Sequence, residues 1–192
     1  QQDLHDHAAH LSARYGYDHL ELLAEGAAHG LCPSPPYRGG YLDMGAAHLH
    51  PLNFALGLAD AAAKAGVRIF ESTEVTGIDE SQPAVIRTSN GSVRAEHVIL
   101  ACNGYLGDLE PKVARRVMPI NNFIVATEPL GDRTNEVLTQ DVAVADTKFV
   151  VNYFRLSHDG RLLFGGGESY GYRFPKDIAA KAWGPMLEIY PH

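Results

Sequence analysis

Apolar residues in the first third of the chain recur at helical spacing. Between residues 3 and 28 this spacing, interrupted near Gly16, predicts two short helices that end at Gly30. A clearer helix is predicted to begin at Pro51. Proline is favoured in the first turn of a helix, because the N–H that it lacks would have no helical partner there. Its leucines and alanines line one face as far as Gly66, a residue typical of the position after a helix. The small side chains of this face predict close packing on a sheet.

After the long helix the apolar pattern changes to the short runs and alternation of β-strands. The run His97–Cys102 is apolar and ends at Asn103-Gly104, which is typical of a buried strand. Helix, strands, hairpin and buried strand in this order are typical of the second half of a nucleotide-binding α/β domain. Strands are also predicted at residues 41–44, 67–71, 74–79, 83–88 and 92–95, with an Asn90-Gly91 hairpin turn between the last two.

The last third of the chain predicts a more exposed antiparallel sheet. Residues 117–127 and 148–157 alternate between apolar and polar positions, and residues 161–165 pair with the second stretch through the turn 158–160. A final helix is predicted near Pro175. The composition shifts near residue 115, which indicates a boundary between two structural units.

Composition narrows the function classes. The 192 residues are 45% hydrophobic and 20% charged, which is typical of a globular protein. The net charge of −7 argues against a nucleic-acid partner, and no apolar window reaches the roughly 18 residues of a membrane helix. Two cysteines without a signal peptide favour a reduced, cytoplasmic setting. Both ends of the sequence look cut, so a piece of a longer protein and a complete natural chain are both expected alternatives.

Glycine-rich stretches are the first candidates for a cofactor site. A strand that runs into Asn103-Gly104 lets a cofactor approach the backbone, although a plain strand-ending turn has the same pattern. No G-x-G-x-x-G motif follows a strand and opens a helix. The stretch Gly165–Gly167 is therefore no phosphate loop. Its bare backbone can let a flat ring pack on the sheet, and a β-bulge is the alternative.

Histidines and aromatic residues provide the other candidates. His48 and His50 precede the long helix, but they lack the further partners that a zinc site needs, so no metal is predicted. His50 is interpreted as a polar group at the helix start or at an active site. Alternation places Tyr153 and Arg155 on one face of a strand and Phe154 on the other, and one of these faces must be core.

Several ordered stretches carry a resemblance to a known family. They are GGYLDMG and HLHPLN before and within the long helix, HVILACNGYLG, MPINNFIVATEPLG, and FVVNYFRLSHDGRLLFGGGESYG. The chain resembles the D-amino-acid-oxidase-like flavoproteins, and within them the gamma-glutamylputrescine oxidase branch, over essentially its whole length.

The resemblance implies FAD as cofactor and assigns roles to a few positions. The matching valine, Val75, contacts the adenine through its backbone. The stretch Ala101, Cys102, Asn103 and Gly104 matches the motif that lies against the pyrophosphate and ribitol, with Cys102 where threonine, glycine or alanine is more usual. The resemblance directs Tyr153 and its neighbours toward the substrate, and together with His50 the residues expected on the substrate side are His50, Tyr153, Arg155 and Tyr170. The resemblance identifies no catalytic residue.

The resemblance also implies a domain layout and a reaction. A mixed α/β fold is expected, in which part of an FAD-binding domain joins an antiparallel-sheet substrate domain. Residues 1–50 would be a helical and loop part of the substrate domain, 51–115 part of the FAD-binding domain, and 116–192 the substrate sheet. The whole protein would oxidise the C–N bond of a small amine to an imine, with oxygen as the final oxidant. The alternatives are a catalytically silent binding module and, third, a histidine-based metal protein.

Overall fold

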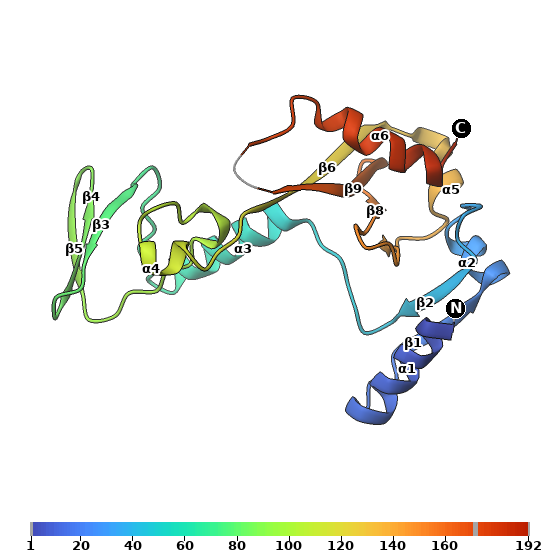
Figure 1. Ribbon diagram of the computed structural model, residues 1–192, viewed down its shortest axis with the longest axis horizontal. Helices are drawn as coiled ribbons and strands as arrows, with labels where there is room; N and C mark the ends of the chain where they lie inside the picture. Colours follow the sequence, from blue (N-terminus) through green and yellow to red (C-terminus); the bar gives the residue numbers. More distant parts are fainter. Residues whose placement is uncertain (1, 171–172, 192) are drawn as a thin grey trace. The chain divides into compact units, whose positions relative to one another are not determined.

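The computed structural model describes residues 2–170 and 173–191, and the chain divides into two compact units (Figure 1). Unit 1 comprises the residues up to His48, Asn121–Ser169, and those from Arg173 on. Unit 2 comprises Leu49–Ile120 together with the short stretch from Tyr170. No described helix has the length and apolar character that a bilayer crossing requires.

Unit 1 begins with helices that flank a small sheet. Helix α1 (Gln2–Tyr15) precedes strand β1 (Leu20–Ala24), helix α2 (Glu25–Leu31) and strand β2 (Gly39–Asp43). The two strands pair antiparallel, with Leu20 opposite Asp43. The prediction of two helices over residues 3–28 is therefore wrong at β1. The apolar pattern of residues 20–24 is compatible with a helix or a strand. The segment forms a strand because it pairs with the distant β2.

The main sheet of unit 1 has four antiparallel strands, as the alternating pattern predicted. Their spatial order is β6-β9-β8-β7, with bounds Ile120–Pro129, Arg161–Tyr170, Tyr153–Leu156 and Val144–Ala145. Strands β8 and β9 pair in the register Tyr153 with Gly165 and Phe154 with Phe164. The turn between them uses Gly160 at φ 75°, a left-handed conformation that glycine adopts without a Cβ penalty. Residues 148–151, predicted as strand, are not part of β8.

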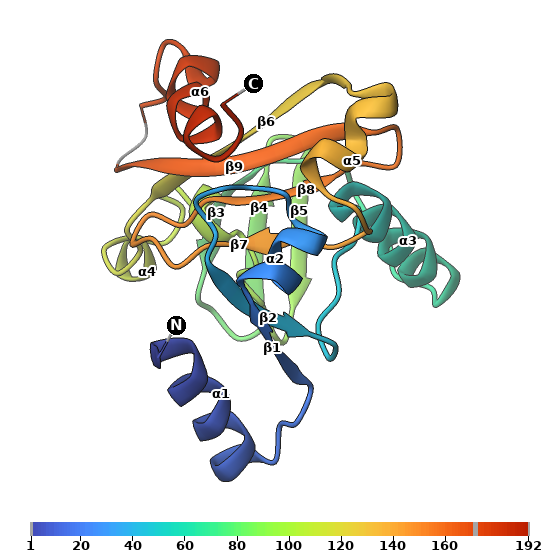
Figure 2. The ribbon, with the colours of Figure 1, turned by 90° about the vertical axis from the view of Figure 1, so that its right-hand side faces the viewer.

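One face of this sheet carries the hydrophobic core of unit 1. Helix α6 (Ile178–Ile189), capped by the Asp177 carboxylate on the Ala180 N–H, lies along that face (Figure 2). Phe154 is stacked between Tyr37 and Phe164, with Tyr190 edge-on against it. The short helices η2 (Gly131–Arg133) and α5 (Thr134–Val137) close one end. Buried core residues are Cys32, Val137, Leu138, Phe154, Leu162, Phe164, Ala182, Ile189 and Tyr190.

Unit 2 holds the long helix and a three-stranded antiparallel sheet. Helix α3 (Pro51–Lys64) has the predicted proline start and is followed by Gly66 at φ 90°. The strands β3, β4 and β5 are Val75–Asp79, Ala84–Thr88 and Gly91–Ala95, in that spatial order. The short helices η1 (Asn103–Tyr105) and α4 (Pro111–Ala114) complete the unit. The predicted hairpin is thus confirmed.

Two predictions for residues 51–71 of unit 2 are wrong. Residues 67–71 form no strand, and within the described chain no residue of α3 is buried, so its small-residue face packs on no sheet. Both predictions concern apolar residues that need a partner surface: Leu52, Phe54, Leu56, Val67, Ile69 and Phe70 are all exposed. An apolar pattern indicates that a surface can be buried, but it does not identify the partner. The mixed α/β class with antiparallel sheets is confirmed.

Candidate functional site

The segment before the predicted cofactor turn belongs to no strand. Residues 97–102 were predicted as a buried strand, yet among the residues that the structure describes no strand pairs with them. Ile99 is 89% exposed, and Val98 and Leu100 are also exposed. The prediction is therefore wrong for this chain, because a strand requires hydrogen-bonding partners that the described residues do not supply.

The turn itself has the geometry of an anion acceptor. Cys102 has right-handed helical angles, φ −86° and ψ −10°, and Asn103 follows with a left-handed φ of 49°. Successive residues of these two hands direct their backbone N–H groups into one small concavity, which favours a negatively charged oxygen. Neither the Asn103 nor the Gly104 N–H donates to another described residue. The chain thus presents free donors where the resemblance expects a pyrophosphate.

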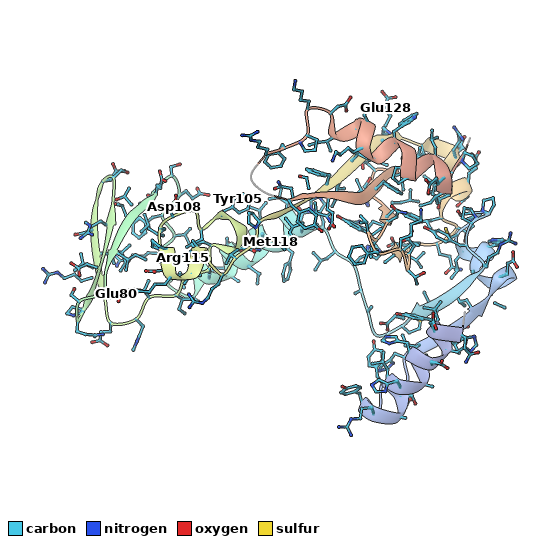
Figure 3. The ribbon with its side chains drawn as sticks, viewed as in Figure 1. Glu80, Tyr105, Asp108, Arg115, Met118 and Glu128 are labelled. Atoms are coloured by element: carbon cyan, nitrogen blue, oxygen red, sulfur yellow. The ribbon has the colours of Figure 1, made fainter. Side chains whose placement is uncertain are left out.

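The surroundings of this turn leave its backbone accessible. Ala101 and Asn103 are exposed, Cys102 and Gly104 are half-buried, and a Cβ on Gly104 would meet no atom within 4 Å. Tyr105, directly after the turn, is 93% exposed (Figure 3). These residues fit a backbone-mediated contact with a phosphate group, since the turn is exposed or half-buried and its Asn103 and Gly104 N–H groups have no acceptor among the described residues.

Val75, the predicted adenine contact, lies in the same unit. It begins β3 opposite Thr88, and the register of the β3–β4 pair shifts between Val75 and Gly77. Its side chain is half-buried. The structure therefore places Val75 at an irregular strand start, and its contact with a cofactor stays a prediction.

His50 caps the long helix. Its Nδ1 accepts a hydrogen bond from the Asn53 N–H at 3.3 Å, which satisfies one of the helix's free first-turn donors. This is the helix-start interpretation of the sequence, and a substrate contact for His50 stays a prediction. His48 pairs instead with Asp141 at 3.3 Å. Across residues 2–170 and 173–191, no three His, Cys, Asp or Glu side chains gather in a way that could hold a metal ion.

Tyr153 and Arg155 lie on the face of the unit 1 sheet that is opposite the core. Phe154 between them is 2% exposed and belongs to the core, so the predicted alternation is confirmed. The Arg155 guanidinium donates to the Leu156 carbonyl at 3.2 Å and has further interactions. Two of the predicted substrate residues are thus brought to one face.

The ring of Tyr153 covers a bare glycine. Gly165 is its direct partner on β9, and a Cβ on Gly165 would overlap the tyrosine ring. The sequence left open whether Gly165–Gly167 holds a flat ring or a bulge. The flat ring is a side chain of the protein itself, and Gly167 adds a left-handed φ of 74°.

Tyr153 also reveals a residue that sequence reasoning missed. Its hydroxyl donates a hydrogen bond to the Asn122 Oδ1 on β6. Burial raises the pKa of Tyr153 above its ordinary value, so the phenol keeps its proton at neutral pH. The available signal was a polar residue at an outward position of β6, with glycine on the strand between.

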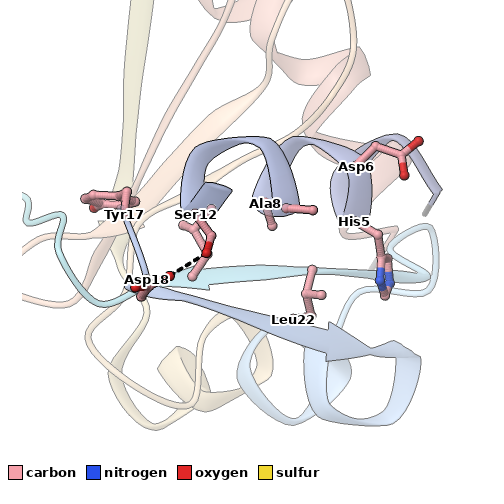
Figure 4. A pocket seen from close by; sticks show the side chains of 9 residues that line it. His5, Asp6, Ala8, Ser12, Tyr17, Asp18 and Leu22 are labelled. Atoms are coloured by element: carbon pink, nitrogen blue, oxygen red, sulfur yellow. Dashed lines mark hydrogen bonds between the residues drawn. The ribbon is translucent and has the colours of Figure 1, made fainter. Parts of the chain in front are cut away.

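A substrate contact for Tyr170, the fourth predicted substrate residue, stays a prediction. Tyr170 ends β9, is 62% exposed, and belongs to unit 2. A separate open hollow of about 450 Å³ lies in unit 1 between α1 and β1 (Figure 4). Its lining includes His5, Asp6 and Asp18, with a Ser12–Asp18 hydrogen bond of 2.6 Å. None of the predicted site residues lines it.

Comparisons with known proteins place these features in a family. Curated relatives include a probable oxidoreductase OrdL of Rhizobium meliloti (strain 1021), 42% identical over all of this chain, which matches 45% of that protein. A gamma-glutamylputrescine oxidoreductase of Escherichia coli (strain K12) is 41% identical over 93% of this chain and 42% of its own length. The chain therefore spans less than half the length of the curated relatives it matches.

Solved structures share the fold at lower identity. Glycine oxidase from Geobacillus kaustophilus superposes with a TM-score of 0.76 at 22% identity, over 99% of this chain and 51% of that one. L-proline dehydrogenase from P. horikoshii gives a TM-score of 0.69 at 18% identity, over 95% and 51%. The family model for FAD dependent oxidoreductases named DAO matches residues 1–192. This chain belongs to the DAO family of FAD dependent oxidoreductases.

Proposed function

We propose that the protein containing this chain is an FAD-dependent oxidase that converts the C–N bond of a small amine to an imine. The carrying observation is the turn at residues 102–104 of a DAO-family chain, where the backbone N–H groups of Asn103 and Gly104 have no acceptor among the described residues. The relative named gamma-glutamylputrescine oxidoreductase supports a gamma-glutamylated amine as substrate. That substrate would give the protein a role in polyamine catabolism.

The cofactor would be held in part by backbone groups of unit 2. The turn Ala101–Gly104 supplies N–H donors to a phosphate oxygen, and the backbone of Val75 would contact the adenine. FAD supplies the acceptor for the two electrons and the proton that leave with the substrate hydride. Because the turn acts through its backbone, Cys102 at this position does not disturb the contact. Molecular oxygen is the proposed final oxidant.

The substrate would lie against the outer face of the unit 1 sheet. A C–H bond beside nitrogen gives up hydride only when the amine is neutral, so the site must lower the pKa of the bound amine. The half-buried phenol ring of Tyr153 offers an apolar wall for this desolvation. Arg155 on the same face can pair with a substrate carboxylate, which a guanidinium fork binds well. His50 and Tyr170 are proposed as further polar contacts.

The partner and the cell compartment follow from the same proposal. A small-molecule amine is the proposed partner, and the net charge of −7 gives no support to a nucleic acid. Both cysteines, Cys32 and Cys102, are free thiols, which supports a reducing compartment such as the cytoplasm.

Flavin absorbance tests this proposal. Protein expressed from its whole reading frame should show an oxidised flavin band near ~450 nm, the signature of a bound flavin cofactor. Gamma-glutamylputrescine added without oxygen should bleach the band faster than glycine, sarcosine or a D-amino acid does. Oxygen uptake would then identify the oxidant. A colourless protein that binds no added FAD would instead support the silent binding module.

A pair of variants tests the turn itself. Gly104→Pro removes one backbone donor and disturbs the left-handed Asn103, whereas Gly104→Ala keeps the N–H and finds open space for its Cβ. Gly104→Pro should weaken FAD binding at least tenfold, while Gly104→Ala should stay within about twofold, since a hydrogen bond to a charged group contributes roughly 1.5–3 kcal/mol. Equal affinities in both variants would show that the turn does not hold the cofactor.

A further inference from the structure

Tyr153 reaches across the sheet to a partner two strands away. The strand order β6-β9-β8 puts β9 between the tyrosine and Asn122. Two strand spacings amount to about 9.5 Å, which the two side chains bridge only if the phenol ring lies flat over β9. Gly165 permits this because it has no Cβ at the crossing point. The three residues, all in unit 1, therefore form one arrangement that fixes the position of the Tyr153 hydroxyl.

This arrangement fixes the chemical character of the hydroxyl as well. A phenol has one proton to donate, and Tyr153 gives it to the Asn122 Oδ1. The remaining lone pairs of the oxygen can only accept hydrogen bonds. The hydroxyl of an ordinary tyrosine in a binding site can bind either a hydrogen-bond donor or an acceptor. The Tyr153 hydroxyl can bind only a donor, because its proton is already used. A carboxylate has no proton to offer and would meet two oxygen atoms with lone pairs.

We propose that Asn122 is a positioning residue that makes Tyr153 the hydrogen-bond acceptor for an N–H of the substrate amine. The arrangement selects amines over carboxylates at this point of the sheet face. The inference rests on the proposed function, since it assumes that the outer face of the sheet receives the substrate. It identifies the nitrogen as the part of the substrate that Tyr153 contacts, and it leaves carboxylate recognition to Arg155.

Ligand binding to the FAD-loaded protein from its whole reading frame tests the inference, with the flavin chemically reduced beforehand and oxygen excluded so that the amine binds without being oxidised. The probes are gamma-glutamylputrescine and an analogue in which a terminal carboxylate replaces the reacting aminomethyl group, both titrated by calorimetry. Asn122→Leu removes the acceptor and frees the tyrosine proton. It should weaken amine binding about tenfold, the effect of losing one well-placed hydrogen bond. Binding of the carboxylate analogue should stay constant or tighten.

Three further variants separate positioning from a general structural effect. Asn122→Asp keeps an acceptor oxygen and should retain amine affinity within about twofold. Tyr153→Phe should weaken amine binding as much as Asn122→Leu, and the double variant should be no weaker than Tyr153→Phe, because both changes remove one coupled interaction. Glu128→Gln, at the other end of the same face of β6, is the matched control and should bind both probes as the wild type does.

The outcomes distinguish this inference from the proposed function. The amine could bleach the flavin of the wild type while Asn122→Leu binds both probes with unchanged affinity. In that case the positioning role is wrong and the proposed function stands. Additive losses in the double variant would also overturn it. If no amine bleaches the flavin or binds, both proposals are wrong.

Discussion

Gly165 has room for a hydrogen atom but not for a methyl group. A Cβ there would overlap the ring of Tyr153, so Gly165→Ala must push the ring off the sheet. We expect a loss of about 1–3 kcal/mol in unfolding free energy, the usual range for overpacking. Gly57→Ala in α3 is the control, because a Cβ there meets nothing within 4 Å. It should be neutral or stabilising by about 0.5–1 kcal/mol. Urea unfolding measures both, and equal midpoints would contradict the close approach.

Tyr190 brings a hydroxyl group into the unit 1 core. Its hydroxyl donates to the Val137 carbonyl at 2.8 Å and lies 3.3 Å from the Cys32 Sγ. Burial raises the pKa of Tyr190 and of Cys32 above their ordinary values of 10.0 and 9.0. Tyr190→Phe leaves the carbonyl unpaired, so it should cost about 1–3 kcal/mol at neutral pH. Tyr105→Phe, on the surface, should cost nothing measurable by the same thermal or urea unfolding.

The same pair predicts how stability depends on pH. Above pH 9 to 10 the unfolded chain loses the Cys32 and Tyr190 protons, whereas the folded chain keeps them. The unfolded state then binds fewer protons, so the unfolding free energy falls as the pH rises. Each such group contributes at most about 1.4 kcal/mol per pH unit. Wild type should therefore lose stability between pH 9 and 11, and Tyr190→Phe should lose less over this range. Parallel curves would contradict the assignment.

The position of a side chain could be predicted from the sequence only where it depends on neighbouring residues of the same element. Alternation placed Phe154 in the core and Tyr153 outside it, because a strand turns each successive side chain to the opposite face. Asn122 was not foreseen, since it is 31 residues away in sequence and meets Tyr153 only through the strand order. Sequence spacing contains no information on which strand will lie between two others.

At the scale of elements, helix ends follow from local chemistry. The Asp177 carboxylate accepts from the Ala180 N–H at 2.9 Å and so satisfies a free donor at the start of α6. Asp177→Ala should lower the unfolding free energy by about 1 kcal/mol, while Asp177→Asn should keep most of it. Thermal unfolding of the two variants checks this, and an Asp177→Asn loss as large as that of alanine would show that the cap contributes only through its charge.

Strands were harder to predict than helices for a related reason. Helix α3 has its own start and stop in Pro51 and Gly66, so the sequence was sufficient. Strand β1 exists because β2 pairs with it, and residues 97–102 form no strand because no described residue pairs with them. A strand's hydrogen bonds come from other segments, and local pattern alone cannot say whether those segments are present.

At the scale of the whole molecule, the two units differ in how much they bury. Nearly all buried apolar residues belong to unit 1, and Leu106 is the single one among the described residues of unit 2. The apolar patterns of α3 and of residues 97–100 predicted burial, but the large apolar side chains of both segments are exposed in the described chain. Whole-chain family membership was within reach of the sequence because it rests on ordered motifs. The roles of the predicted FAD-binding and substrate segments stay predictions.

Hydrogen exchange can decide whether unit 2 receives the cofactor. In the protein from its whole reading frame, FAD-loaded and FAD-stripped samples should differ most in peptides that cover residues 97–105 and the start of β3 at Val75. The reason is that the free N–H groups of Asn103 and Gly104 would acquire an acceptor, and a hydrogen-bonded amide exchanges only when its bond opens. Helix α6 is the internal control, because its amides are already bonded in the unit 1 core. If protection rose in α6 and not at the turn, the cofactor would bind elsewhere, and the free donors at residues 102–104 would be only the end of a loop.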